Sequence, residues 1–295
     1  MQADGATNQQ QEQRQWQVPT EPAEPRFAGL TVPPENPDRA RLFQLSGEER
    51  RLALELKAAV EADEELEPLP DLQYVQFVIT FGGDLKATLE RVRGLQAFRH
   101  EYKINDTIEE GMILVSAFTR EHPGCLLSFA YDDETENYGG IYDRSRMNHQ
   151  ILKTDQNWRV FLGSAFYIFN ALCPDPHSMR QGVFFIAECQ DTQSQKMSVD
   201  ALQQCWYHFL HHVPVFLRSI LFFHTNTVAN LSYSLMKPFM RHDVRNRITV
   251  GCQLGVNLSS LYLLPTPEMA TQRILMRFAD FMTTRYENQE SFSLS

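Results

Sequence analysis

Three histidines in the second half of the chain have the spacing of metal ligands. His208, His211 and His212 lie three and four residues apart, so on a helix they share one face and could hold a zinc ion. The glutamate that a zinc-protease helix needs is missing, however, and the helix has to end before Pro214. We therefore interpret these histidines as surface or capping residues, and we expect the protein to need neither a metal nor a cofactor.

No segment has the pattern of a catalytic nucleophile or of a nucleotide-binding loop. The Gly163-Ser164-Ala165 sequence falls inside a predicted helix and lacks the second glycine of a nucleophile elbow. Neither a Walker A sequence nor a G-x-G-x-x-G sequence occurs. A hydrolase needs a nucleophile, a base and oxyanion donors in one cleft, and the sequence offers no such trio. We predict that the protein is not an enzyme and keep a small-molecule hydrolase as a weak alternative.

A basic cluster interrupts an otherwise acidic chain. The formal net charge is -10 and the isoelectric point is about 5.4, which argues against nucleic-acid binding. Between residues 237 and 247, by contrast, four basic residues face a single aspartate, Asp243. Such charges either favour the end of a helix dipole or form a landing patch for anionic lipid headgroups. The four basic residues are Lys237, Arg241, Arg245 and Arg247.

The elements that would position these groups alternate between strand and helix. Short apolar runs at 182–188, 217–224 and 247–251 predict strands, and the segments 198–213 and 227–239 between them predict helices. This alternation predicts a parallel sheet with crossover helices. Upstream, 125–133 and 138–144 predict two strands joined by a polar turn. The fold class is therefore α/β, with a mixed and largely parallel sheet.

Helical periodicity also organises the rest of the chain. The segment 154–172 carries one continuous apolar stripe, and a last helix is predicted to start near Pro267. Residues 1–42 hold six of the 15 prolines and a run of glutamines, which predicts a disordered tail. A capping box at Ser46 to Glu49 opens a helical lobe over 43–105, broken at Pro68 and Pro70 and again at Gly82 and Gly83. The main domain then spans 106–290.

Cysteine usage and hydropathy indicate the compartment. The five cysteines are odd in number and form no C-x-x-C pair, so we expect a reduced, intracellular protein. The N-terminus lacks the apolar stretch of a signal peptide, and no run reaches the ~20 apolar residues of a membrane span. We expect a soluble, cytoplasmic monomer that contacts membranes only peripherally.

Four segments together resemble the CRAL-TRIO lipid-binding family, which includes tocopherol-, retinal- and phosphatidylinositol-transfer proteins. The sequence LMKPFM at 235–240 is similar to the "KPFL" end of the family's gate helix, and RNRITV at 245–250 to the strand entry that follows it. HVP at 212–214 stands at the family's aromatic-Tyr-Pro position, and 72–102 is similar to its N-terminal helices. Their order and spacing carry the resemblance.

The resemblance implies that one hydrophobic lipid is held in an apolar cavity beneath a gate helix, and that basic residues after the gate contact phosphatidylinositol bisphosphate. Without the resemblance, the same aromatic residues favour an ordinary α/β core over a pocket. A one-residue slip in strand register would also reverse the chosen face of the 182–188 strand. Pocket residues are expected on the 154–172 helix and on one face of the 182–188 strand, at Phe161, Ala165, Phe166, Phe169, Val183, Phe185 and Ala187. Gate residues are expected at Val228, Leu231, Leu235, Met236 and Phe239.

At two positions the sequence differs from the phosphatidylinositol-binding branch of the family, which indicates the branch that it resembles more. Val215 follows Pro214 where the phosphatidylinositol-binding branch has a glutamate, and Arg247 replaces that branch's lysine. The tocopherol and retinal branch is therefore the closer match. A protein-interaction module whose cavity is filled by side chains remains the main alternative.

Overall fold

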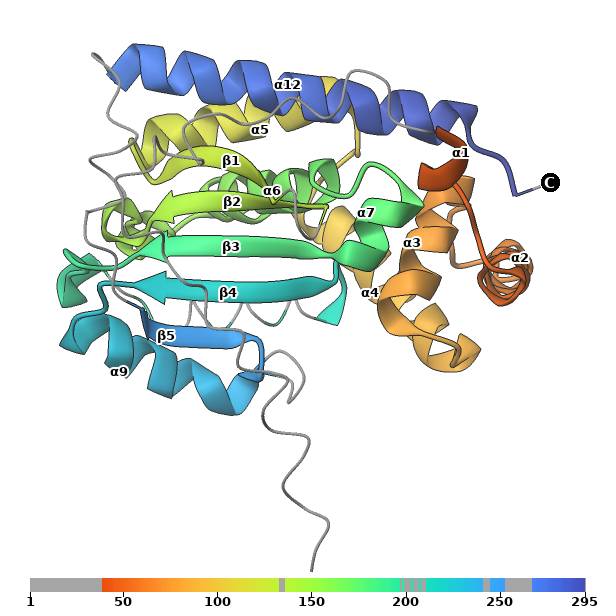
Figure 1. The fold of residues 1–295 in the computed structure, drawn as a ribbon, viewed down its shortest axis with the longest axis horizontal. Helices are drawn as coiled ribbons and strands as arrows, with labels where there is room; N and C mark the ends of the chain where they lie inside the picture. The colour runs from red at the N-terminus through yellow and green to blue at the C-terminus, as the bar shows by residue number, and fades with distance from the viewer. Residues whose placement is uncertain are drawn as a thin grey trace, which may run out of the picture.

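The computed structural model describes residues 39–132, 136–196, 198, 203, 207, 211–240, 245–252 and 267–294. Helices pack around a five-stranded sheet, with a helical lobe beside the edge where the parallel strands begin (Figure 1). Most of the predicted 198–213 helix and residue Arg241 lie outside the described residues.

The sheet confirms the predicted mixed, largely parallel arrangement. Its order follows the chain, from β1 to β5. The first two strands are antiparallel, whereas each later strand is parallel to its predecessor. The strands are β1 (Leu126–Asp132), β2 (Asn137–Asp143), β3 (Val183–Glu188), β4 (Leu217–Phe223) and β5 (Ile248–Cys252).

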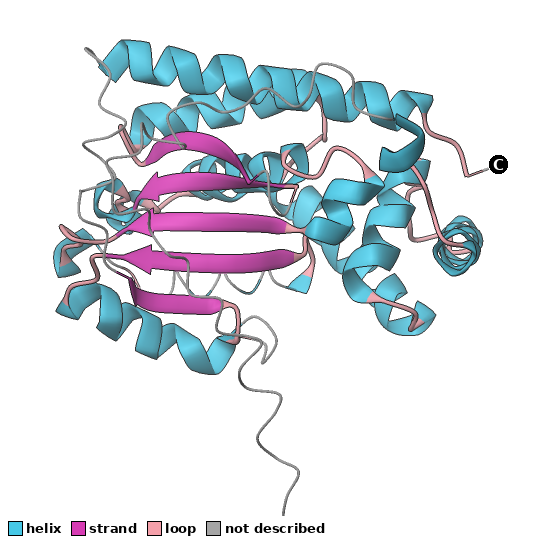
Figure 2. Ribbon diagram, in the orientation of Figure 1, coloured by secondary structure: helices cyan, strands magenta, loops and turns pink. Residues whose placement is uncertain are grey.

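Helices α6 (Asp155–Ala171) and α9 (Thr227–Met236) pack on the same face of this sheet. The ring of Phe169 in α6 meets Phe185 of β3, and Tyr233 in α9 meets Phe222 of β4. Phe222 pairs with Ala187, which lies two residues after Phe185 and so on the same face of the sheet. The rings of Phe185 and Phe222 therefore project from one face. Figure 2 shows helices gathered behind the strands in this view. Right-handed crossovers between parallel strands place their helices in this way.

The helical lobe begins with the predicted capping box. The Ser46 side chain accepts a hydrogen bond from the Glu49 N–H, and the Glu49 carboxylate accepts one from the Ser46 N–H. The breaks at the prolines and at Gly82 are also confirmed, and the lobe consists of α2 (Gly47–Glu61), α3 (Asp71–Phe81) and α4 (Leu85–Tyr102). One short helix, α1 (Arg39–Leu42), falls within the predicted tail, and its Arg41 forms an ion pair with Glu136.

Two long helices close the side of the sheet near β1. They are α5 (Ile108–Glu121) and α12 (Pro267–Ser291), and α12 starts at the predicted proline. Short elements connect the strands to the main helices: α7 (Pro176–Gln181), η1 (Arg144–Arg146), η2 (His149–Ile151), η3 (Ser194–Lys196) and η4 (Lys237–Phe239). Among the described residues, no helix is both long and apolar enough to cross a bilayer.

Candidate functional site

The candidate site is built on the face of β3 that α6 and α9 cover. Val183, Phe185 and Ala187 are buried in the main core together with the helices. Phe184 and Ile186 lie in a second apolar cluster, because adjacent residues of a strand point to opposite faces. The strand therefore presents its three predicted residues to the helices that would enclose a ligand.

The four predicted residues of α6 do not all approach β3. Phe169 does, with its ring 4.8 Å from that of Phe185. Phe166 instead packs on Phe98 of α4, at 6.3 Å between ring centroids. Phe161 contacts a pair of buried histidines, and Ala165 is half-buried at the edge of the core. The predicted stripe is thus divided between the sheet, the helical lobe and the histidines.

The predicted gate residues of α9 lie on more than one side of the helix. Its buried residues are Ala229, Ser232 and Met236, and its Tyr233 ring lies 6.4 Å from Phe222. Two of the predicted gate residues point outward, Leu231 with 58% and Leu235 with 45% of the side chain exposed. Val228 is half-buried, and the side chain of Phe239 lies outside the described residues. Among the four predicted gate residues whose side chains the structure describes, only Met236 is fully buried.

Helix α9 is anchored at its first residue by polar groups at the carboxyl ends of the parallel strands. Asn226 caps the helix by accepting from the Ala229 N–H, and its amide donates to the carbonyls of Gln190 and Thr192. Just before it, the His224 imidazole lies 2.8 Å from the buried Glu188 carboxylate at the end of β3. Helix α9 therefore starts at a hydrogen-bonded junction between β3 and β4.

Two buried histidines border this site, and no sequence pattern pointed to them. His122 ends α5 and His149 starts η2, and both rings pack against Phe161. Burial lowers the pKa of His122 to about 4. Burial, followed by the charge of Arg144, lowers the pKa of His149 to about 3. Both imidazoles are therefore uncharged at neutral pH. They are 27 residues apart in sequence, so only the fold brings them together.

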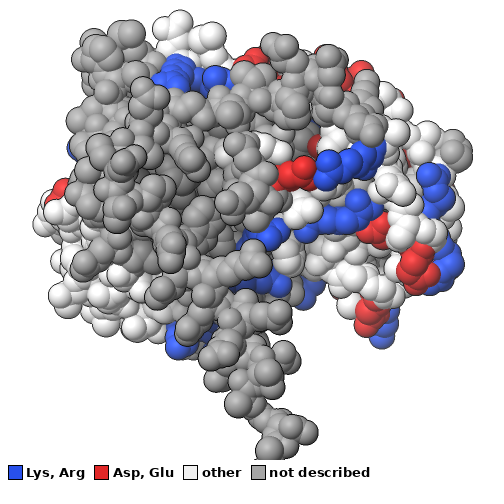
Figure 3. Space-filling view, viewed as in Figure 1, with Lys and Arg blue, Asp and Glu red and all other residues white. Residues whose placement is uncertain are grey.

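The predicted basic patch contains residues in different environments. Lys237 is exposed, whereas Arg245 and Arg247 are partly covered. The Arg247 guanidinium lies 4.2 Å from the centroid of the Phe216 ring and donates to the Leu217 carbonyl. Around the helical lobe, basic and acidic side chains are interspersed (Figure 3), as in the ion pair between Arg93 and Asp63.

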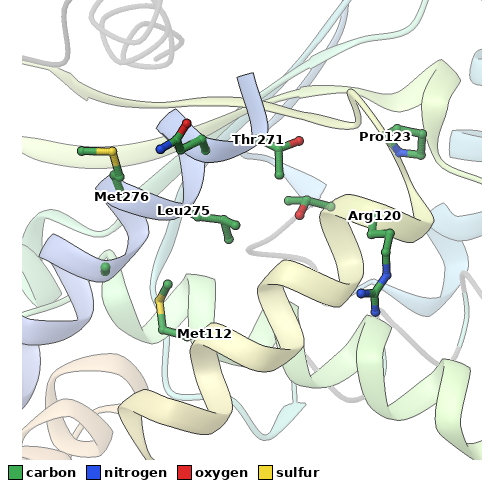
Figure 4. Close-up of a pocket in the computed structure, with 9 residues that line it drawn as sticks. Met112, Arg120, Pro123, Thr271, Leu275 and Met276 are labelled. Carbon is green, nitrogen blue, oxygen red and sulfur yellow. The ribbon is translucent and has the colours of Figure 1, made fainter. Parts of the chain in front are cut away.

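A separate apolar pocket of about 640 Å³ lies between α5 and α12 (Figure 4). Met112 and Leu275 contribute to its apolar wall, and Met276 stands at its edge with 63% of its side chain exposed. None of the predicted pocket or gate residues lines it. It is therefore distinct from the candidate site beneath α9.

The largely parallel sheet, its two covering helices and the aromatic layer between them give the chain an α/β fold. Residues 141–253 match the CRAL/TRIO domain. The crystal structure of Sfh5 is similar to this chain, with a TM-score of 0.51 and 13% sequence identity, over 79% of this chain and 97% of that one. No curated protein matches the sequence. The structural likeness shows the fold, and the family match is confined to residues 141–253, which include β3, β4, α9 and β5.

Proposed function

We propose that the protein binds a single hydrophobic lipid between the sheet and helices α6 and α9, and exchanges it with membranes. The observation that carries the proposal is the amphiphilic placement of α9. Its inner side adds Ala229 and Met236 to the core, while Leu231 and Leu235 remain exposed on its outer side. Apolar side chains on the surface of a helix favour insertion at a membrane interface. A helix with this arrangement can leave the sheet when its outer side enters the bilayer.

The proposed mechanism is physical rather than chemical. When α9 moves outward, the aromatic layer of Phe169, Phe185 and Phe222 becomes accessible to a lipid chain. Each methylene transferred from water into such a layer contributes about 0.8 kcal/mol. The lipid comes from a bilayer interior that is equally apolar, so the free energy of the exchange is close to zero. Helix α9 returns to the same position because Asn226 fixes its first turn.

We further propose that Lys237, Arg241, Arg245 and Arg247 contact phosphatidylinositol bisphosphate while α9 is open. The support is their position directly after the exposed apolar side of α9. Each basic side chain near an anionic surface adds about 1 kcal/mol. Binding to vesicles containing this lipid should weaken as salt rises, because the Debye length falls from ~10 Å at 0.1 M to ~3 Å at 1 M. Vesicle binding that is independent of both salt and phosphoinositide would contradict this contact.

The central experiment is recovery of the ligand. Purified protein is extracted with organic solvent, the extract is analysed by mass spectrometry, and lipid transfer between vesicles is measured on the same preparation. We expect one class of lipid at close to one molecule per chain, and transfer above the spontaneous rate. If no bound lipid is recovered and no transfer is measured, the proposal is overturned. That result would favour a protein-interaction module with a filled interior.

A further inference from the structure

Two buried histidines beside the candidate site have hydrogen-bonding groups that no described residue satisfies. His122 is 1% and His149 is 2% exposed. Nδ1 of His122 accepts a hydrogen bond from the Asn148 N–H, at 3.3 Å, so the proton of the neutral ring is on Nε2. This buried Nε2, like the buried Nδ1 of His149, has no hydrogen-bond partner in the described part of the chain. Buried polar groups without partners are rare and call for an explanation.

The two rings lie at the border of the aromatic layer. Their centroids are 6.1 Å (His122) and 5.8 Å (His149) from that of Phe161, whose helix also supplies Phe169 to the sheet. Near His149, the Arg144 guanidinium lies 5.4 Å from the centroid of Phe222, the residue that meets α9. The histidines therefore stand where the apolar layer meets the polar ends of the strands. A lipid chain lying along the layer would place its polar end there.

We propose that His122 and His149 bind an uncharged oxygen, a hydroxyl or a carbonyl, at the polar end of the lipid. This inference rests on the proposed function and specifies its ligand class. His122 offers its Nε2–H as a donor, because its Nδ1 already accepts from the Asn148 N–H. Nδ1 of the neutral His149 ring accepts or donates according to its tautomer, so the pair suits a hydroxyl or a carbonyl oxygen. An anionic headgroup would favour protonated rings, which the burial of both side chains opposes.

Other ligands fit these residues less well. A metal ion held by side chains would need more ligands, and the described residues contain no cluster of three or more histidine, cysteine, aspartate or glutamate side chains that could hold one. The charge of Arg144 helps to lower the pKa of His149. Its guanidinium lies over the Phe222 ring and hydrogen-bonds to Cys189, so it already has partners other than a ligand. An uncharged oxygen can pair with an orphaned nitrogen without adding a buried charge.

The test compares ligands that share one chain length and differ in their polar end. Displacement of bound Nile red is measured with oleyl alcohol, with 9-octadecene and with oleate, on the wild type and on His122→Phe and His149→Phe. We expect the wild type to prefer the alcohol to the alkene by about tenfold, the difference that one hydrogen bond of ~1.4 kcal/mol makes. Each Phe variant should reduce this preference severalfold while binding the alkene as before. His100→Phe, at an exposed position on α4, is the matched control.

The outcomes separate this inference from the proposed function. If no lipid displaces Nile red and none is recovered from the protein, the proposed function fails. If the lipids bind but the wild type shows no preference for the alcohol, or prefers oleate, only this inference is overturned. Zinc binding that both Phe variants abolish would overturn it as well. A second measurement needs no variant: in ¹⁵N NMR of the wild type, oleyl alcohol should shift the His122 Nε2 resonance and 9-octadecene should not, and equal spectra would contradict the inference.

Discussion

At the scale of single residues, burial decides what a polar side chain does. His122 and His149 are uncharged because the core excludes the protonated form. Arg247 illustrates the opposite case, since it stays charged but spends its guanidinium on Phe216 and the Leu217 carbonyl. The neighbours of a polar side chain therefore decide which interactions it makes.

Because two histidines are buried in the uncharged form, we expect the folded protein to lose stability in weak acid. Their ordinary pKa is 6.5, and in the folded protein it is about 4 for His122 and about 3 for His149. The unfolded chain therefore binds protons first, and the free energy of unfolding falls as the pH drops from about 6.5 to about 4. For His122 alone the loss is up to about 3 kcal/mol. Urea unfolding of the wild type and of His122→Phe between pH 7 and pH 4 measures it; equal pH dependence in the two proteins would contradict the assignment.

Arg247 and Lys237 should respond differently to truncation. Arg247→Ala removes the contact with Phe216 and leaves the Leu217 carbonyl without that donor, so we expect a loss of about 1–3 kcal/mol. Lys237→Ala, at an exposed position, should change stability by less than about 0.5 kcal/mol. Thermal unfolding measures both. If Arg247→Ala unfolds like the wild type and only weakens vesicle binding, Arg247 serves the membrane patch alone.

At the scale of elements, α9 differs from α6 in leaving large apolar side chains exposed. Helix α6 buries its apolar stripe among other elements of the core. Helix α9 buries Met236 and Tyr233 against the sheet side while Leu231 and Leu235 face outward. The proposed gate role of α9 rests on this difference.

The outer side of α9 should be needed for transfer but not for folding. The double variant Leu231→Ser and Leu235→Ser removes apolar area that is already exposed, so the melting temperature should change little. Lipid transfer between vesicles should fall severalfold, because the helix loses its contact with the bilayer. Leu54→Ser on α2, where the side chain is 43% exposed, is the control and should transfer lipid normally. A double variant as active as the control would exclude α9 as the membrane-facing gate.

At the scale of the whole molecule, α12 joins the helical lobe to the sheet domain through one buried cation. Arg285 is 1% exposed and donates to the carbonyls of Asn170 and Cys173 and to the side-chain oxygen of Gln76 in α3. Burial lowers its pKa, and the three acceptors compensate for the lost hydration. Three segments distant in sequence therefore depend on one side chain.

Replacing this cation should weaken the whole fold in a single step. Arg285→Met keeps much of the length of the side chain but removes the donors to the Cys173 carbonyl and to the Gln76 amide oxygen, while the Asn170 carbonyl keeps the Cys173 N–H. We expect a loss of about 2–4 kcal/mol in one cooperative transition. Arg277→Met on the same helix is the control and should cost less than about 1 kcal/mol. Urea unfolding followed by circular dichroism distinguishes the two, and a separate early transition would show that the lobe and the sheet domain unfold independently.

The sequence by itself determined the elements whose signals are local. The capping box at Ser46, the break at Gly82, the start of α12 at Pro267 and the five strands all follow from residues close together in the chain. Backbone hydrogen bonds and side-chain periodicity act over a few residues, so a short window is enough to reveal them.

Only the tertiary structure decided which side chains meet. Helix α9 carries apolar residues around most of its circumference, so periodicity could not tell that Tyr233 faces the sheet and Leu231 faces outward. His122 and His149 became neighbours of one phenylalanine only when α5, η2 and α6 packed together. Such contacts depend on partners far along the chain. The orientation of each side chain is fixed by the packing of the whole core, which no local pattern encodes.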